Sequence, residues 1–538
     1  MIHDIPGASG GDAFGYRVVV VGDVDLDGRD DFAVSAPGWG GGAGRVELFS
    51  GASAVSLGSV QGAGTDLFGL SLSALGDVDG DSIGDVAVGA PQRGVRDSGF
   101  GDPSSGPGYV RVVSGANLST IRTHFGVASR DAYGNSVHGG EDADGDGVGD
   151  YVIGAPYQAG AELRSGATGA LLRSFPAVGP EFGYTVALVP DLDGDGLADV
   201  LVAETGEFQG FPSTVYAYGG ASGLELWTQS SGVGGELGWV MLADDDVDLD
   251  GTPDVILADR EWDNALSALG HGRLRWVSGA SGATLLTLPG PAPALGVGFG
   301  LGLAHVGDLD GDGLRDLAIA STGLYESNGF AYPGQPLRFT HAWPPELVNE
   351  LAAPGASETF GQALAAGQLD GDGIVDLIVG APRDDGLQPQ SGRVRVYTYL
   401  TDPQVYCASQ SNSQGCVPHT FWTGTASAAL STFRVHADDV LNQQIGLFNW
   451  GPVPNQTPFG DGTLCVGSPV VRTPGQLSGG TVGPDDCSGS FAYQFTSPYL
   501  AGQGLVPGSV VHAQYWSRDP AAPSAFHLTD AVRFSVLP

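Results

Sequence analysis

Short apolar runs, separated by polar stretches rich in turn residues, dominate about the first 400 residues of the chain. Residues 184–189 have an alternating pattern, whereas residues 86–89 and 377–380 are continuous apolar runs. Alternation is typical of a half-buried strand, and a short continuous run bounded by turns is typical of a strand buried on both faces. With 89 glycines to supply tight turns, the pattern predicts an all-β fold of many short strands.

An acidic loop recurs seven times among these strands, at intervals of about fifty to sixty residues. In residues 191–199, aspartates stand at positions 1, 3, 5 and 9 of the loop, and Gly196 stands at position 6, where a tight loop needs a positive φ. Four carboxylates so close together repel one another unless a cation lies among them, and hard oxygen ligands in a flexible loop favour Ca²⁺. The sequence therefore predicts up to seven calcium sites.

In each loop the predicted ligands are the side chains at positions 1, 3, 5 and 9 and the backbone carbonyl at position 7. They are Asp23, Asp25, Asp27, Arg29 and Asp31; Asp77, Asp79, Asp81, Ile83 and Asp85; Asp142, Asp144, Asp146, Val148 and Asp150; Asp191, Asp193, Asp195, Leu197 and Asp199; Asp246, Asp248, Asp250, Thr252 and Asp254; Asp308, Asp310, Asp312, Leu314 and Asp316; and Gln368, Asp370, Asp372, Ile374 and Asp376.

Two of the loops depart from the pattern. Ser82 replaces the glycine in the second copy, at a cost of about 1 kcal/mol for the strained turn. Gln368 replaces the first aspartate in the seventh copy, which removes one charge and predicts weaker binding. Solvated Asp-Gly turns are the simpler alternative for any one loop. An EF-hand is disfavoured because strands flank the loops and no glutamate stands at position 12. The predicted ions are structural rather than catalytic.

Each acidic loop lies within a longer repeat. An aromatic or leucine followed by glycine comes before the first strand, as at Phe68-Gly69, and Gly-Ala-Pro ends the second strand in several copies, as at Gly89-Ala90-Pro91. A third strand, a Ser-Gly-Ala turn and a fourth strand follow. Four antiparallel strands in each of seven repeats predict a β-propeller.

The aromatic-Gly pair, the acidic loop and Gly-Ala-Pro, in this order, resemble the FG-GAP repeat of the integrin α-subunit propeller. The resemblance covers about residues 1–400 and implies seven blades, with Ca²⁺ between the first and second strands and a ligand-binding role in adhesion. Three copies depart from Gly-Ala-Pro: Ala203-Glu204-Thr205, Ala258-Asp259 and Ala320-Ser321-Thr322. Integrins carry such loops on only some blades, so a loop in every blade is a heavier calcium load.

The repeat ends near residue 401, which predicts a propeller over residues 1–401 and a small β-sandwich-like domain over residues 402–538. The seventh repeat has no fourth strand of its own. Residues 1–6 stand before Phe14-Gly15 as fourth strands stand before the later pairs, so we expect them to supply the outer strand of blade 7 and to close the ring.

All four cysteines lie in the second domain: Cys407, Cys416, Cys465 and Cys487. Four cysteines allow three pairings, of which the local one joins Cys407 to Cys416 and Cys465 to Cys487. A zinc site is the alternative, but the spacings do not match paired Cys-x-x-Cys ligands. We therefore expect two disulfides.

Antiparallel alternation predicts that the acidic loops and the Ser-Gly-Ala turns share one face of the propeller. The loops that follow the second strands, whose lengths differ between blades, then form the opposite face, where a ligand is expected. Its candidate contacts are aromatic and arginine side chains that could meet a protein or a glycan. They are Trp39, Arg93, Arg96, Arg260, Trp262, Tyr325 and Arg383.

The leading functional hypothesis is an exported adhesion or recognition module, with no catalytic residues assigned. Two alternatives remain: a polysaccharide hydrolase or lyase using variable-face acids such as Glu204, Asp259, Glu261, Glu326 and Asp384, or a purely structural surface protein. Solvated loop acids are the simpler interpretation of these five.

The formal net charge of −39 disfavours nucleic acid as a partner, and no apolar run is long enough to span a membrane. Residues 1–7 do not resemble a signal peptide. Export with removal of a leader is nevertheless expected, because all four cysteines lie after residue 400 and calcium loops need the high calcium concentrations found more often outside cells.

Overall fold

The computed structural model divides into two compact units, Met1–Tyr399 and Leu400–Pro538. It describes residues 2–536 apart from a set of internal segments. Those segments are 93–105, 158–159, 206–211, 233–234, 261–271, 291–296, 308–313, 324–336, 342–345, 352–358, 372–374, 386–387, 399–403, 408, 410, 425, 429–430, 461 and 507–508.

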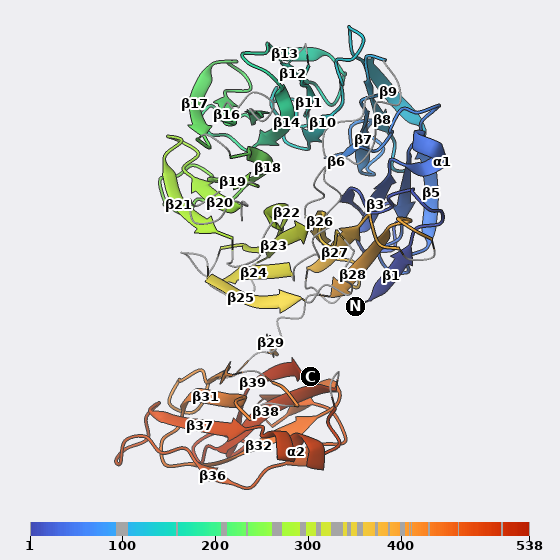
Figure 1. Cartoon of the computed structure of the whole chain (residues 1–538). Coiled ribbons are helices and arrows are strands. Elements are labelled where there is room, and N and C mark those ends of the chain that lie inside the picture. Colours follow the sequence, from blue (N-terminus) through green and yellow to red (C-terminus); the bar gives the residue numbers. More distant parts are fainter. Residues whose placement is uncertain are drawn as a thin grey trace. The chain divides into compact units, whose positions relative to one another are not determined.

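The first unit contains seven antiparallel four-stranded sheets, which surround a common centre (Figure 1). Blade 1 consists of β2 (Val18–Gly22), β3 (Asp31–Ala36), β4 (Arg45–Phe49) and β5 (Ser56–Gln61), with the short α1 (Trp39–Gly42) after β3. Blade 2 consists of β6 (Ser71–Gly76), β7 (Asp85–Ala90), β8 (Tyr109–Val113) and β9 (Thr120–Phe125). Blade 3 consists of β10 (Ser136–Gly139), β11 (Tyr151–Ala155), β12 (Gly160–Arg164) and β13 (Leu171–Phe175). Blade 4 consists of β14 (Phe182–Val189), β15 (Asp199–Glu204), β16 (Thr214–Tyr218) and β17 (Glu225–Ser230).

The remaining blades repeat this arrangement. Blade 5 consists of β18 (Leu237–Ala243), β19 (Val255–Asp259), β20 (Arg273–Val277) and β21 (Thr284–Pro289). Blade 6 consists of β22 (Val297–Gly307), β23 (Asp316–Gly323), β24 (Leu337–His341) and β25 (Glu346–Leu351). Blade 7 consists of β26 (Ala363–Gly367), β27 (Asp376–Ala381), β28 (Arg393–Thr398) and β1 (His3–Pro6). The predicted seven-bladed propeller is confirmed.

The innermost strands of consecutive blades contact one another around the whole ring, including β2 of blade 1 against β26 of blade 7. Strand β1 pairs antiparallel with β28, with His3 opposite Val396. The Asp4 carboxylate accepts two hydrogen bonds from Nη1 of Arg393, at 2.7 and 2.8 Å, which adds an ion pair to this pairing. The first strand of the chain is therefore the outer strand of blade 7, next to β28, the last strand of the propeller in sequence.

Among the described residues, an apolar cluster fills each of the seven seams between neighbouring blades. The aromatic or leucine of each aromatic-Gly pair belongs to the cluster shared with the preceding blade; Phe182, for example, is fully buried between blades 3 and 4. The glycine after it, Gly183, has φ +91°, and a Cβ there would lie 2.2 Å from the carbonyl oxygen of Gly160. In each pair the first side chain thus fills the seam. At the second position, glycine lets the backbone pass close to the neighbouring blade.

The second unit is β-sandwich-like, as predicted. One sheet has the order β29 (Gln404–Tyr406), β39 (Phe526–Ser535), β38 (Val510–Arg518), β32 (Ile445–Gly451) and β35 (Val471–Arg472), with β36 (Gln476–Leu477) also paired to β32. The other has the order β30 (His419–Thr423), β31 (Arg434–Val440) and β37 (Gly489–Gln494). A hairpin of β33 (Pro454–Phe459) and β34 (Gly462–Val466), and helix α2 (Ser497–Gly502), complete the unit. Its core is aromatic, with Phe448, Phe495 and Phe534 fully buried.

The unit contains two disulfides, but the local pairing expected from the sequence is wrong. Cys407 pairs with Cys465 and Cys416 with Cys487, at Cα separations of 6.4 and 5.9 Å, and no cysteine is free. Strands β30 and β37 both run antiparallel to β31, so they begin at the same end of their sheet. Cys416 and Cys487, which precede these strands, are therefore neighbours although 71 residues separate them.

Candidate metal centres

Each acidic loop connects the first and second strands of a blade, as the sequence predicted. In blades 1 to 5, the aspartate at position 1 holds the loop in shape by accepting backbone N–H groups of the same loop. In blade 4, Oδ1 of Asp191 accepts the N–H of Gly194 and Oδ2 accepts that of Gly196, both at 2.7 Å. The bond from position 6 to Oδ2 of position 1 recurs in blades 1, 2, 3 and 5 at 2.7–2.8 Å. These loops share one conformation.

Position 4 of the loop also requires a positive φ, which the sequence did not lead us to expect. Gly194 has φ +83° there and Gly196 has φ +86° at position 6. In blades 1 and 5 position 4 is a leucine, and both Leu26 and Leu249 have φ +62°. Ser82 of blade 2 has φ +72°, so the strain expected at position 6 of that loop is present. An Asp-x-Asp motif with glycine at x in the other loops was the available signal.

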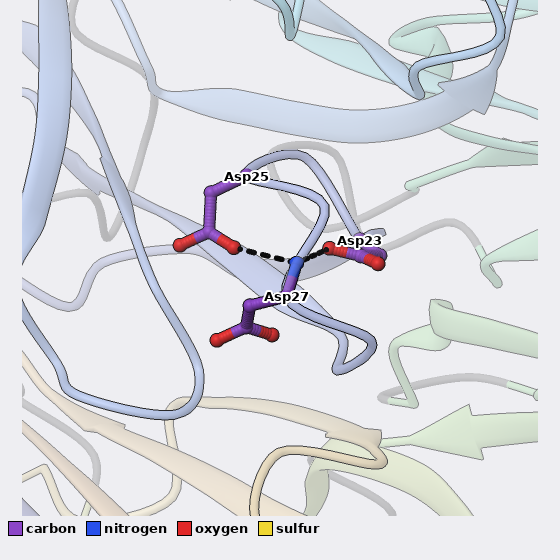
Figure 2. A group of neighbouring side chains, drawn as sticks. All are labelled: Asp23, Asp25 and Asp27. Atoms are coloured by element: carbon purple, nitrogen blue, oxygen red, sulfur yellow. Dashed lines mark hydrogen bonds between the residues drawn. The ribbon is translucent and has the colours of Figure 1, made fainter.

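Among the described residues, carboxylates gather in five of the loops. In blades 1, 3 and 5, oxygen atoms from positions 1, 3 and 5 all lie within 4.8 Å of one another, and Figure 2 shows Asp23, Asp25 and Asp27 of the first group. In blades 2 and 4 the corresponding groups come from positions 1, 3 and 9. Asp308, Asp310, Asp312, Asp372 and Ile374, which were predicted ligands in blades 6 and 7, lie outside the described residues.

The aspartate at position 9 differs from the others because it is buried. Asp199 is 0% exposed; its Oδ2 accepts the N–H of Leu192 at position 2, and its Oδ1 accepts the N–H of Gly220 in the turn between the third and fourth strands. The same two bonds occur at Asp31, Asp85, Asp150 and Asp254. Position 9 therefore ties the loop to the glycine of the Ser-Gly-Ala turn, which confirms that both features share a face.

In the described part of blade 7, the aspartate at position 9 makes the hydrogen bond within the loop but not the one to a turn between third and fourth strands. Oδ2 of Asp376 accepts the N–H of Leu369, but no backbone N–H of a described residue reaches its Oδ1. After β28 the chain leaves the propeller, so no Ser-Gly-Ala turn follows in this blade. Loop 7 thus departs from the others at position 9 as well as at Gln368.

Electrostatics separates the two kinds of aspartate. Burial raises the pKa of Asp199 to about 6, outweighing the N–H groups of Gly220 and Leu192, and the carboxylates of Asp193 and Asp195 raise it further. At Asp142, position 1 of blade 3, burial also acts to raise the pKa, but the surrounding backbone N–H groups outweigh it and lower the pKa overall. A cation near position 9 would stabilise a carboxylate that burial alone disfavours in its charged form.

The carboxylate at position 5 orients position 7. Its Oδ1 accepts the N–H of the position 7 residue at 2.9–3.0 Å in all five loops, which are those of Arg29, Ile83, Val148, Leu197 and Thr252. The groups that could bind a metal are several carboxylates and a backbone carbonyl. All are hard oxygen ligands, and the hydrogen bonds already hold the loop in shape. This set fits Ca²⁺, which accepts six to eight oxygen ligands, and offers no nitrogen or sulfur ligand of the kind that zinc prefers.

On the opposite face, three of the predicted ligand contacts are described. Trp39 is half-buried against the blade 1 and 7 cluster, with the Arg45 guanidinium 5.8 Å from its ring centre. Arg383 is half-buried after β27. Arg260 is only 3% exposed; it pairs with Glu236 and lies 3.7 Å from the ring centre of Trp239, so it lies beneath the surface rather than on it. Arg93, Arg96, Trp262 and Tyr325 lie outside the described residues.

The expectation that the acids of this face are solvated is wrong for two of them. Asp259 is fully buried and accepts hydrogen bonds from Arg273, and Asp384 is 4% exposed and pairs with Arg393 and Arg395. Glu204 accepts a hydrogen bond from the Tyr216 hydroxyl. Each side chain is held by its own blade's third strand, because residues there face the end of the second strand. Glu261 and Glu326 lie outside the described residues.

Comparison with known proteins finds the same repeat in this chain. The FG-GAP repeat model matches residues 14–49, 68–112, 182–221 and 360–397, in blades 1, 2, 4 and 7. Integrin alpha-E of Mus musculus is 31% identical over 207 residues, 35% of this chain and 16% of the relative. Integrin alpha-PS2 of Drosophila melanogaster is 32% identical over 148 residues, 27% of this chain and 10% of the relative. Integrin alpha-IIb of Homo sapiens is 33% identical over 175 residues, 29% of this chain and 16% of the relative. The matches thus span at most about a sixth of these relatives. Within the described residues, no helix has the length and apolar character needed to cross a membrane.

Proposed function

We propose that this FG-GAP repeat protein is an exported, calcium-stabilised propeller that recognises a protein ligand in adhesion. The observation that carries the proposal is the repetition of one acidic loop on one face, with carboxylate oxygens gathered within 4.8 Å in five blades. Such repetition suits a structural metal load. The opposite face, where loop lengths differ, then remains for recognition.

In each loop, the ion would be held by the carboxylates at positions 1, 3, 5 and 9 and by the carbonyl at position 7. Bound calcium supplies positive charge that offsets repulsion among these carboxylates and links the first and second strands. Because the unfolded chain has no such site, an ion at a hundred times its dissociation constant would add about 2.7 kcal/mol to stability. The chain's −39 formal charge makes this contribution matter more, since self-repulsion opposes the compact state.

The proposal that the propeller recognises a protein ligand is supported by the similarity to integrin α-subunits and by the residues of the variable face. Matched relatives are integrin α-subunits, and the variable face here carries Trp39 and Arg383 after second strands. An aromatic and an arginine on the same face can provide apolar contact and a planar cation that pairs with carboxylates of a protein. Two disulfides in the second unit are consistent with an oxidising, extracellular location.

Calcium binding is tested by titrating Ca²⁺ into protein stripped with EGTA, using calorimetry and thermal unfolding. We expect at least five ions per chain and a large rise in the unfolding midpoint, with a much smaller rise in Mg²⁺. Absence of binding heat, or equal stabilisation by both ions, would contradict the calcium proposal.

Recognition is tested separately, by passing a panel of secreted and cell-surface proteins over the immobilised full chain in calcium. For any protein that binds, Trp39→Ala and Arg383→Ala should weaken binding several-fold. Leu224→Ala is the matched control because Leu224 is 68% exposed in a turn between third and fourth strands, on the calcium-loop face. Weakening by the control alone would move the ligand to the calcium-loop face.

A further inference from the structure

The outer face of the larger sheet in the second unit is distinct from the propeller. Phe448 and Trp450 of β32 and Tyr515 of β38 point into the core, so the alternate residues of these strands point outward. Leu447 stands opposite Trp516, and both belong to this outer set. Part of the face is covered by the β33–β34 hairpin, where the N–H of Cys465 bonds to Oε1 of Gln514. Elsewhere on this face, Ile445 and Arg518 are exposed and Leu447 and Trp516 are half-buried.

An apolar stripe crosses this part of the face from strand to strand. Leu477 of β36 stands opposite Ile445 of β32, and these two side chains are 60% and 54% exposed. Leu447 follows on the same side of β32, opposite Trp516. The Trp516 ring lies 5.9 Å from that of Phe526, which lies 5.1 Å from that of Phe459 at the hairpin end. With neighbouring strands about 4.8 Å apart, the stripe is roughly 20 Å long.

Two arginines share this face. Arg472 stands opposite the outward-facing Asn449, and Arg518 stands opposite Phe526. Both guanidinium-bearing residues are exposed, and no described residue forms an ion pair with either. In the strands of this sheet the one acidic residue is Asp530, which is 8% exposed. The face is therefore apolar with a cationic rim, on a chain whose formal charge is −39.

We propose that this stripe, formed by Leu477, Ile445, Leu447, Trp516, Phe526 and Phe459, binds an apolar segment of a partner protein flanked by carboxylates. At about 3.3 Å per residue, roughly six extended residues would cover it. Apolar side chains would bury the stripe, and the flanking carboxylates would pair with Arg472 and Arg518. The second unit then contributes a docking surface of its own, separate from recognition by the propeller.

Other occupants fit less well. Three of the six stripe residues are aliphatic and offer no aromatic ring on which a sugar could stack. An anionic membrane would repel a chain of net charge −39 that offers only two arginines here. In a twofold dimer through this face, the same patch would meet itself, bringing like-charged guanidinium groups together.

The test is selection of a random dodecapeptide phage library on the immobilised full chain, followed by affinity measurement of the selected peptides as synthetic peptides. We expect enrichment of apolar residues flanked by Asp or Glu, and binding that weakens as salt rises. Ile445→Ser/Leu477→Ser and Arg472→Gln/Arg518→Gln should each weaken binding at least tenfold. All four side chains are exposed, so these variants should unfold at the same temperature as the parent protein.

Val482→Ser/Val506→Ser is the matched control, because these valines are 92% and 61% exposed in the same unit but lie outside the stripe. It should bind the selected peptides as the parent does. The proposal is overturned if the peptides bind the Ile445→Ser/Leu477→Ser variant equally well, or if sedimentation shows that the full chain dimerises through the stripe. Binding lost only in the arginine variant would indicate a general anion site and would also overturn it.

Discussion

The backbone N–H of Ala198 donates a 2.9 Å hydrogen bond to the carbonyl oxygen of Asp142. Ala198 is position 8 of the blade 4 loop, and Asp142 is position 1 of the blade 3 loop. Asp30 makes the same bond to Gln368 across blades 1 and 7, also at 2.9 Å. The N–H of Arg315 in blade 6 donates instead to the Asp245 carboxylate beside the blade 5 loop, at 2.7 Å. Three pairs of neighbouring acidic loops are thus connected among the described residues, those of blades 3 and 4, blades 7 and 1, and blades 5 and 6.

Ala198→Pro should uncouple loops 3 and 4. Proline has no N–H to donate, and blade 5 already has Pro253 at this position, so the local backbone accepts it. We expect a loss of about 1 kcal/mol of stability, the typical contribution of one hydrogen bond, and calcium binding of lower apparent cooperativity. Urea unfolding and calcium titration measure the two effects. Ala198→Ser keeps the N–H and is the control; equal losses in both variants would contradict the role given to the bond.

Asp199→Asn and Asp195→Asn should separate the structural and ligand roles within one loop. Asp199 is buried and accepts two backbone N–H groups, so an amide nitrogen would face a donor and about 1–3 kcal/mol of stability should be lost even in EGTA. Asp195 is exposed, so its variant should unfold normally in EGTA and lose stabilisation only when calcium is added. Urea unfolding in both buffers checks this. Equal behaviour of the two variants in EGTA would show that position 9 has no separate structural role.

The blades were predictable because their signals are local and repeated. Phe182-Gly183, the acidic loop and the following apolar run stand at fixed spacing, and the fold needs each of them within a few residues. The buried role of Asp199 was not predictable in the same way. Its partner Gly220 lies in the next turn of the blade, and only the strand pairing brings the two together.

Long-range pairing also explains the errors. The local pairing predicted from the sequence joins Cys416 to Cys407, whereas sheet order brings Cys416 to Cys487. The position of Asp259 at the end of a strand beside a variable loop predicts a solvated acid, but Asp259 is buried and pairs with Arg273 of the third strand. A single sequence does not reveal which strand supplies such a partner.

Ser82→Gly in blade 2 and Gly196→Ser in blade 4 form a reciprocal test of loop strain. Both positions have positive φ, at +72° and +86°, where a residue with a Cβ costs about 1–2 kcal/mol. We expect Ser82→Gly to raise stability by up to about 1 kcal/mol and Gly196→Ser to lower it by a similar amount. Calcium affinity should change in the same directions, because each loop must hold this conformation to bind. Urea unfolding with and without calcium measures both; changes of the same sign would rule out strain as their cause.

His512 should make the second unit less stable in acid. Burial lowers the pKa of His512 to about 4, with the nearby Arg533 lowering it further, while Nδ1 lies 3.1 Å from the Tyr406 hydroxyl. The unfolded chain, with a histidine pKa near 6.5, binds the proton first, so stability is retained above about pH 6.5 and falls as the pH drops toward 4. Pulse proteolysis in urea, with fragments from residues 404–536 identified by mass spectrometry, follows this unit within the full chain. His512→Gln should flatten the dependence between pH 6.5 and 4, and an unchanged slope in that variant would assign the acid sensitivity to other groups.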